Sequence, residues 1–450
     1  MKIPVIGSSR SASLKVIIIA VLTLALLIPL GMIKNIVVDR QANASAAALD
    51  IRNLWGGAQT VTGPILKLPY QQENQTVYGL NYVDEKFVYL LADELFINAV
   101  VATEVRYRGI HKVPVFTAII KISGRVDFEA LEVLGISSEK IRWSGAELFL
   151  GISDPMVVSK LPVVTVNAED ISFTAGGTGI DGIPSQLSAP LGKALDGLST
   201  AKPVQLDISL AVNGSGSLKF LPLAENSEVT MAANWASPSF TGRQLPLVRE
   251  VRDDGFEATW QSSHIGRKLP RAWLGGDDAQ YVALQGAFGA RFIQAVSLYQ
   301  LIERSTKYAV LIIGLTFVAF FLMEVVADLR LHPLQYLLVG LANTLFFLLL
   351  LSLAEHVGFD VAYVASAFAS TSLIAGYGAA ILLRRLRALL MAGVLAALYL
   401  LLYMTLKAQS FALLAGSIGL WVALGAVMYL TRRINWYADS GGRQKQVGEG

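Results

Sequence analysis

Hydrophobic residues gather into long runs at the two ends of the chain. The first run extends from Val16 to Ile33 and follows a short basic segment. A helix needs about 20 apolar residues to cross a hydrocarbon layer, with about 17 as the lower limit. The apolar region of a cleaved signal peptide is shorter, about 7 to 15 residues. We therefore predict an uncleaved transmembrane helix over residues 16–34, with cleavage near Ala44-Ser45-Ala46 as the alternative.

Five further runs of membrane length follow in the last third of the chain. They are separated by short polar segments and comprise Tyr308–Ala327, Leu334–Ala354, Val361–Leu383, Ala388–Leu406 and Phe411–Leu430. This pattern predicts a membrane protein with an α-helical bundle of six spans. One span lies before a long polar insert, and a five-helix bundle over residues 308–430 lies after it.

Basic residues predict how the spans are oriented. Lys and Arg in short loops stay on the cytoplasmic side. They occur in the N-terminal segment, at Arg384-Arg385-Leu386-Arg387 and in the C-terminal tail, whereas the loop between the third and fourth spans carries Glu355 and Asp360. We therefore expect residues 1–15 and 431–450 in the cytoplasm and residues 35–307 in the periplasm.

The insert alternates between apolar and polar residues along most of its length. Such alternation over short segments between turn residues is typical of β-strands, for example at Val100–Tyr107, Val113–Phe128 and Val204–Val212. We predict a large β-rich, sandwich-like domain over residues 35–307 with helical ends at Ile36–Leu54 and Ala287–Tyr308. A weak internal similarity between its two halves leaves open whether it has one lobe or two.

Composition excludes several function classes. The chain is 54% hydrophobic and 16% charged, its net charge is +3, and it has no cysteine and four histidines. A disulfide framework, a thiolate metal site and a cysteine nucleophile are therefore excluded, and a basic nucleic-acid-binding surface is not expected. The Gly-x-Ser-x-Gly, phosphate-loop and His-Glu-x-x-His motifs do not occur. We predict no enzyme activity, no cofactor, no metal and no nucleic-acid partner.

Few polar residues inside the spans invite a functional interpretation. Glu324 is the only acidic residue within an apolar run, and ionisable groups at membrane depth are functional candidates. The alternative places Glu324 at the membrane interface or in an ion pair with Arg330. His332-Pro333 and Glu355-His356 lie in loops that we expect on opposite faces of the membrane, so they are better explained as turns than as one site.

Several segments together carry a resemblance to a known family. Their most distinctive residues are Trp55, Gly56, Gln59, Gly63 and Pro64; Phe240, Gly242, Gly255, Phe256 and Trp260; His332, Pro333 and Tyr336; Glu355 and His356; and Arg432, Arg433, Trp436 and Tyr437. With these residues the chain resembles the CreD (also called Cet) family of inner-membrane proteins of Gram-negative bacteria. The resemblance implies a role in cell-envelope integrity, linked to a two-component regulon and to colicin tolerance. It implies no molecular activity.

These observations lead to one hypothesis and one alternative. We expect a non-enzymatic inner-membrane protein that contacts the lipid bilayer and uses its periplasmic domain to bind an unknown envelope protein or cell-wall component. The alternative is a transporter or channel whose bundle moves a small solute or ion. Glu324→Gln distinguishes them, because loss of an ion- or solute-dependent phenotype at normal protein level favours transport.

Reporter fusions test the predicted topology. A reporter that is active only in the periplasm should work when it is fused within residues 35–307, between Glu355 and Asp360, or near Lys407. It should fail at Arg384 and after Arg432, because the positive charges there hold these segments in the cytoplasm. Periplasmic activity after Arg432 would mean an odd number of spans and would contradict the predicted six-span topology.

Overall fold

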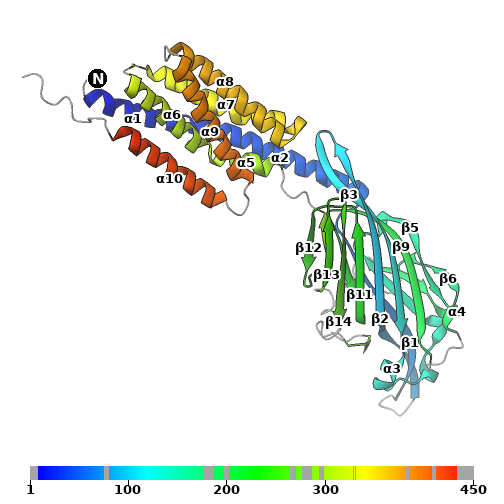
Figure 1. Ribbon diagram of the computed structural model, residues 1–450. Coiled ribbons are helices and arrows are strands. Elements are labelled where there is room, and N and C mark those ends of the chain that lie inside the picture. Colours follow the sequence, from blue (N-terminus) through cyan, green and yellow to red (C-terminus); the bar gives the residue numbers. More distant parts are fainter. Residues whose placement is uncertain are drawn as a thin grey trace, which may run out of the picture. The chain divides into compact units, whose positions relative to one another are not determined.

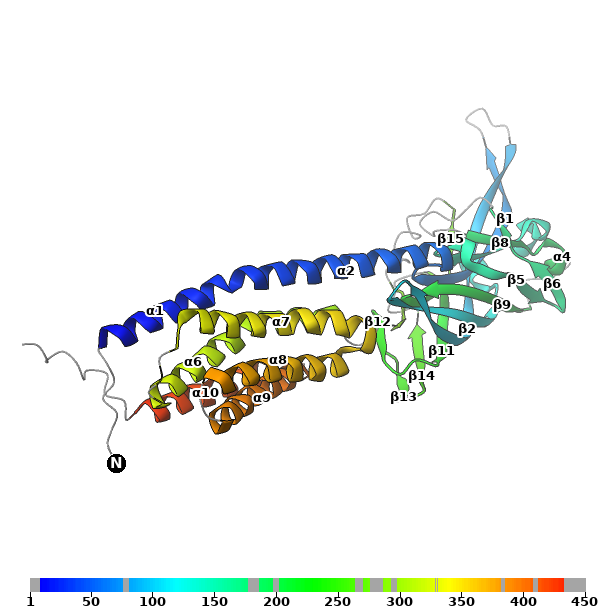
Figure 2. The same cartoon turned by 90° about the horizontal axis from the view of Figure 1, so that it is seen from above.

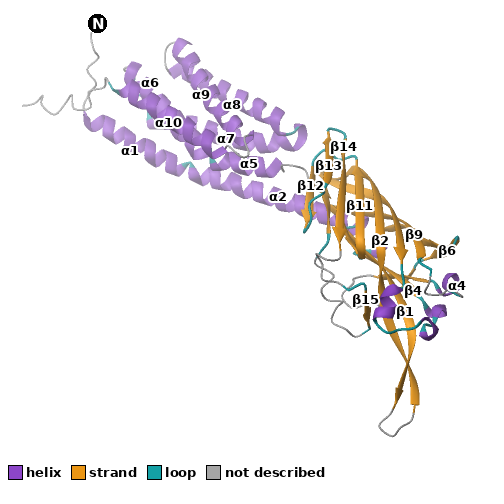
Figure 3. Ribbon diagram, turned by 60° about the horizontal axis from the view of Figure 1, so that its bottom comes forward, coloured by secondary structure: helices purple, strands orange, loops and turns teal. Residues whose placement is uncertain are grey.

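The computed structural model divides the chain into two compact units. The membrane unit comprises Met1–Ala44 and Val296–Gly450, and the β unit comprises Ser45–Ala295. Helices make up the first and strands dominate the second (Figure 3). The structure describes residues 9–75, 81–176, 186–196, 202–263, 270–275, 286–292, 298–327, 329, 331–381, 385–407 and 412–432.

Each predicted apolar run coincides with a helix. The helices are α1 (Ser9–Ala25), α2 (Leu27–Trp55), α5 (Leu298–Lys307), α6 (Ala309–Ala327), α7 (Pro333–Val357), α8 (Phe359–Ile381), α9 (Arg385–Lys407) and α10 (Ala412–Thr431). Within the described residues, four stretches are long and apolar enough to cross a membrane: Lys15–Trp55, α7, α8 and α9. A fifth is added if α5 and α6, bent by 43°, form one span. The chain is a membrane protein with several spans, and the count of six stays a prediction.

The first span is part of the helical core and does not stand apart from it. Leu26, Leu30 and Val37 are buried in one apolar cluster with residues of α6 and α7. Gly340 on α7 leaves the room for this contact, because a Cβ there would meet the Leu26 side chain and lie 2.8 Å from the Phe317 ring. Small residues allow helices to approach closely in lipid. Figure 2 shows α1 and α2 as an almost continuous rod beside α7.

The β unit is a sandwich of two sheets (Figure 1). One sheet has the strand order β12 (Pro238–Gly242), β16 (Phe288–Phe292), β10 (Ser217–Pro222), β1 (Gln59–Gln75), β4 (Glu147–Ile152), β8 (Gln186–Pro190) and β7 (Thr174–Ala175). The other has the order β6 (Glu169–Ser172), β5 (Val158–Val166), β9 (Val204–Ser215), β3 (His111–Val126), β2 (Asn81–Arg108), β11 (Ala224–Ala233), β14 (Gly255–Ser263) and β13 (Val248–Arg252). The short helices α3 (Glu129–Val133) and α4 (Gly192–Leu195) complete the unit.

The long strand β2 belongs to both sheets and makes the sandwich one unit. Its first part pairs antiparallel with β1 and with β15 (Ala272–Leu274), and its second part pairs with β3 and β11. The sequence left open whether the domain has one lobe or two, and the structure groups Ser45–Ala295 as one compact unit. Val88 and Leu90 of β2 belong to the main core, and Tyr89 and Leu91 on its other face belong to a second, smaller cluster, so this strand joins both clusters.

Aromatic side chains join the inner faces of the two sheets. The Trp260 ring on β14 lies 5.9 Å from Phe288 and 5.8 Å from Phe240, centroid to centroid. On the neighbouring strands, Phe116 of β3 lies 5.2 Å from Phe292 of β16. Trp260 is fully buried, as expected for a core residue, and Trp143 and Trp235 pack against the same core while partly exposed.

The predicted helix over Ala287–Tyr308 is wrong in its first part. Phe288–Phe292 is the strand β16, which lies between β10 and β12. Phe288, Ala290 and Phe292 alternate into the core, and this period of two competes with the helical spacing that Phe292 shares with later apolar residues. In the described part of this stretch the helix is α5, from Leu298, whereas Phe288–Phe292 is a strand because the edge of β10 supplies it with hydrogen-bond partners.

Truncation of Trp260 tests whether this aromatic core holds the sandwich together. Trp260→Ala removes a fully buried ring and should destabilise the β unit by about 3–5 kcal/mol. Thermal unfolding of the full-length protein in detergent, followed by near-ultraviolet circular dichroism, measures the change. Phe96→Ala is the control, since Phe96 is 53% exposed on β2 and its loss should cost little. Equal melting temperatures for the two variants would contradict this assignment of the core.

Candidate functional site

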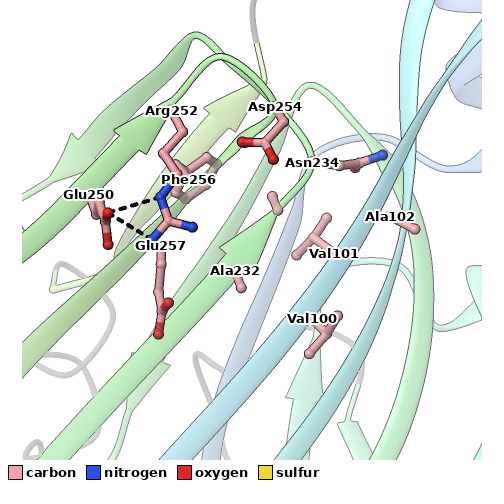
Figure 4. Close-up of a pocket in the computed structure, with 12 residues that line it drawn as sticks. Val100, Val101, Ala102, Ala232, Asn234, Glu250, Arg252, Asp254, Phe256 and Glu257 are labelled. Atoms are coloured by element: carbon pink, nitrogen blue, oxygen red, sulfur yellow. Dashed lines mark hydrogen bonds and ion pairs between the residues drawn. The ribbon is translucent and has the colours of Figure 1, made fainter.

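A groove on the outer face of the β unit is a candidate binding site (Figure 4). It has a volume of about 440 Å³ and runs over the second half of β2 and the adjoining ends of β11, β13 and β14. Val100, Ala102 and Ala232 form an apolar floor, and Val100 is 57% exposed. Strand alternation explains the exposure, because every second residue of β2 points away from the sandwich core.

Charged side chains line one side of this groove. Arg252 on β13 donates a hydrogen bond to Glu250 at 2.9 Å and forms an ion pair with it at 2.7 Å. The hydrogen bond and the negative charge of Glu250 raise the pKa of Arg252 above its ordinary value, so the guanidinium stays charged. Asp254 and Glu257 lie within electrostatic reach of the same guanidinium. Three carboxylates around one guanidinium leave this wall acidic.

A second hollow lies over β2, β11 and β14, three of the four strands that line the groove. It has a volume of about 340 Å³ and is lined by residues of β2, β11 and β14, including Glu94, Phe96 and Glu228. Pairing of β2 with β11 sets Phe96 opposite Glu228 and Val100 opposite Ala232. The outer face of these strands therefore combines exposed apolar side chains with carboxylates along two hollows.

The first group of family-motif residues fixes the end of α2 to the sandwich. The Trp55 indole donates a hydrogen bond to the Phe116 carbonyl at 3.3 Å, and Arg106 stacks on its ring at 4.3 Å. Gly56 has a φ of +109°, which suits glycine, and its carbonyl accepts a hydrogen bond from Ser215. Gln59 is fully buried at the start of β1. These residues serve a structural junction.

Gly63 and Pro64 lie at an irregular point of β1. Gly63 has a φ of +106°, and the register with β4 shifts between Thr62 and Ile65. A Cβ on Gly63 would lie 3.3 Å from the Phe149 carbonyl oxygen, so the backbones approach closely here. This pair shapes a bulge that is buried in the sheet.

The second group of motif residues lies on β12 and β14 and reaches the groove. Phe240 packs edge-on against Phe256 at 5.6 Å and Trp260 at 5.8 Å. Gly242 and Gly255 each sit against the backbone of a neighbouring strand, where a Cβ would collide with a carbonyl oxygen. Gly255 and Phe256 also line the groove. The structure thus brings together residues that the sequence placed in two separate segments.

Glu324 is buried and paired inside the membrane unit. The residue is 3% exposed, and its carboxylate forms an ion pair with Lys15 of α1. It also accepts hydrogen bonds from the Tyr336 hydroxyl at 2.8 Å and from the Leu331 backbone N–H at 3.0 Å. Its position at the membrane interface stays a prediction, because the partner Lys15 is the first residue of the first apolar stretch. Arg330, the partner that the sequence suggested, lies outside the described residues, and Lys15 is the partner that the structure describes.

His332 and Pro333 start helix α7. The His332 ring accepts a hydrogen bond from the Leu334 N–H at 3.2 Å, and the Gln335 side chain accepts one from the His332 N–H at 2.9 Å. Pro333 occupies the first turn, where its missing N–H costs nothing. This reciprocal capping fixes the chain near Leu331 and Tyr336, and so positions two of the three donors to Glu324.

Glu355 joins three helices near the other end of α7. Tyr299 of α5 donates a hydrogen bond to it at 3.0 Å, and Arg40 of α2 lies 3.8 Å away. His356 contacts only the Ser352 carbonyl of its own helix in the interactions described, at 3.0 Å. The two histidines therefore belong to separate structural features. Arg432 stacks on Tyr429 at 3.9 Å, and Arg433, Trp436 and Tyr437 lie outside the described residues.

Sequence reasoning missed two features of these sites. Lys15 looked like a basic flank of the first span, and its partner lies 309 residues away. The groove had a detectable signal, because Phe96 and Val100 are apolar at alternate positions where a half-buried strand carries polar residues. In the part of the chain that the structure describes, no three His, Asp or Glu side chains are grouped as metal ligands.

Single and double substitutions test the Lys15–Glu324 pair. Glu324→Gln leaves the Lys15 ammonium without its partner and should lower the stability of the membrane unit by up to about 3 kcal/mol. Lys15→Met combined with Glu324→Gln should recover part of this loss, because no unpaired charge remains. Thermal stability in detergent, read by size-exclusion chromatography, measures both. Lys34→Met, an exposed change, is the control, and strictly additive losses would contradict the pairing.

Comparison with known proteins agrees with these features. The family model described as "Inner membrane protein CreD" matches residues 11–437, which include both units. Inner membrane protein CreD of Escherichia coli (strain K12) is 32% identical over 424 residues, covering 93% of this chain and 92% of that protein. Several apolar helices in the membrane unit agree with a multi-pass protein of the inner membrane. The chain therefore belongs to the CreD family of inner membrane proteins.

Proposed function

We propose that this protein contributes to cell-envelope integrity by binding an envelope component through its β unit, without catalysis. The observation that carries the proposal is the 440 Å³ groove over β2, β11, β13 and β14. A concave site with an apolar floor and a few polar groups at its rim is the usual form of a binding site.

The groove's chemistry favours a particular kind of partner. Its floor offers Val100, Ala102 and Ala232, and its wall carries Glu250, Asp254 and Glu257 around Arg252. A partner that presents apolar groups next to amines or basic side chains would complement both features. Charged groups at a rim select partners and speed their encounter more than they add affinity. A basic envelope protein or an amine-bearing cell-wall component fits this description.

The proposal includes the predicted topology. Six spans with both termini in the cytoplasm would place residues 35–307, and with them the groove, in the periplasm. The distribution of basic residues supports this orientation. The transporter alternative is weaker. Glu324 is the only acidic side chain within the predicted spans, and it already forms one ion pair and accepts two hydrogen bonds within the fold.

Photo-cross-linking in living cells tests the groove. A photoreactive residue placed at Val100, on the floor, should yield a discrete adduct with an envelope protein or a peptidoglycan fragment. The same residue at Leu161, which is 69% exposed on β5, is the control and should yield none. Mass spectrometry identifies the adduct, and equal labelling from both positions would contradict a site in this groove.

Charge reversal tests the chemistry of the rim. Glu257→Lys should reduce the Val100 adduct about fivefold, since it replaces an exposed attraction with a repulsion and such pairs are worth up to about 1 kcal/mol. Glu169→Lys makes the same change on β6, away from the groove, and should leave the adduct unchanged. An adduct that is insensitive to Glu257→Lys would exclude a basic partner at this wall.

A further inference from the structure

The interior of the helix bundle contains a group of polar side chains that the proposed function does not use. Asn343 of α7 is fully buried, and its side-chain oxygen accepts a hydrogen bond from the Tyr399 hydroxyl of α9 at 3.0 Å. Ser366 and Ser370 of α8 are 0% and 2% exposed. Tyr363, one turn before Ser366, donates to the Tyr399 carbonyl at 2.7 Å, so α8 and α9 meet at this level.

Three polar atoms of this group have no hydrogen-bond partner in the protein. They are the side-chain nitrogen of Asn343 and the hydroxyl oxygens of Ser366 and Ser370. Ser370 lies near the Tyr399 hydroxyl, without a hydrogen bond of ordinary geometry. An unsatisfied buried polar group costs about 1–3 kcal/mol, so three on two packed helices are unusual.

The two serines differ from the other buried hydroxyls of the membrane unit. A serine or threonine in a helix usually satisfies its hydroxyl by donating to a carbonyl one turn back. Thr316, Thr344 and Thr405 do so at 2.7, 2.9 and 2.8 Å. Ser366 and Ser370 do not, and both lie on the buried face of α8. Their hydroxyls are therefore available to a molecule held between α7, α8 and α9.

We propose that Asn343, Ser366 and Ser370 form an internal hydration site in the bundle, which binds water that exchanges with the aqueous phase. The group offers amide N–H donors and two hydroxyls that can donate or accept, and water can use both kinds. It contains no charged side chain to neutralise an ion, which is costly to bury in this environment. Buried water is typically held by hydrogen bonds to otherwise unsatisfied buried polar groups, and these three atoms are of that kind.

Cysteine reactivity tests the proposal directly, because the chain has no cysteine of its own. Ser366→Cys and Ser370→Cys are nearly isosteric, and a thiol reacts as the thiolate, which forms where water reaches it. In membranes treated with methyl methanethiosulfonate, both variants should react at least about tenfold faster than two controls on α8. The controls are Ile374→Cys, buried among apolar side chains, and Phe368→Cys, whose native side chain is 74% exposed on the surface of the bundle.

A second measurement covers the case in which the reagent is too large to enter. In a dry site, Ser366→Ala removes an unsatisfied hydroxyl and should raise the melting temperature of the full-length protein in detergent. In a hydrated site it removes a water ligand, and the melting temperature should fall by a few degrees. Fast labelling or a lowered melting temperature supports the hydration site. Labelling at the rate of both controls together with a raised melting temperature overturns it.

Discussion

Hydrocarbon offers no hydrogen-bond partner to a peptide group, and this constraint orders the whole protein. Each backbone segment inside the membrane must satisfy its own N–H and C=O groups, which restricts the membrane unit to helices. The strands, which need neighbours to pair with, are all gathered in the β unit. Helix α2 contributes residues to both units. It starts among the apolar helices and ends at Trp55, which donates a hydrogen bond to β3.

The same constraint governs the few polar side chains among the helices. Glu324 is tolerated because Lys15, Tyr336 and the Leu331 N–H together satisfy its carboxylate. The capping of α7 by His332 and Gln335 holds two of these donors in place. At the other end of α7, Glu355 meets Tyr299 and Arg40. Ionic contacts thus join helices from both ends of the sequence into one unit, while apolar side chains account for most of the buried contacts between these helices.

In the β unit, the side chains on the inner faces of the sheets form the core, so a binding site has to use side chains on the outer faces. The inner faces of both sheets are committed to Trp260, Phe288 and their neighbours. Alternation then leaves Val100 and Glu257 on the outside at the groove, and Phe96 on the outside at the second hollow. Gly255 lets two strands approach closely at the rim, and Phe256, the next residue of this family motif, lines the groove.

Periodicity determined most of the helices and strands, because burial on one face leaves its period in the sequence. The apolar runs locate the membrane helices and the alternating segments locate β3 and β9 to within a few residues, whereas at β2 the segment Val100–Tyr107 covers only the end of a strand that begins at Asn81. Strand β16 was misjudged, since Phe288–Phe292 fits both periods and only its pairing with β10 and β12 decides. Only the tertiary structure shows which residues that are distant in sequence lie next to each other. Lys15 meets Glu324, β2 joins two sheets, and Val100 meets Arg252 across one groove because packing brings them together, and no local pattern records which distant segment will be the neighbour.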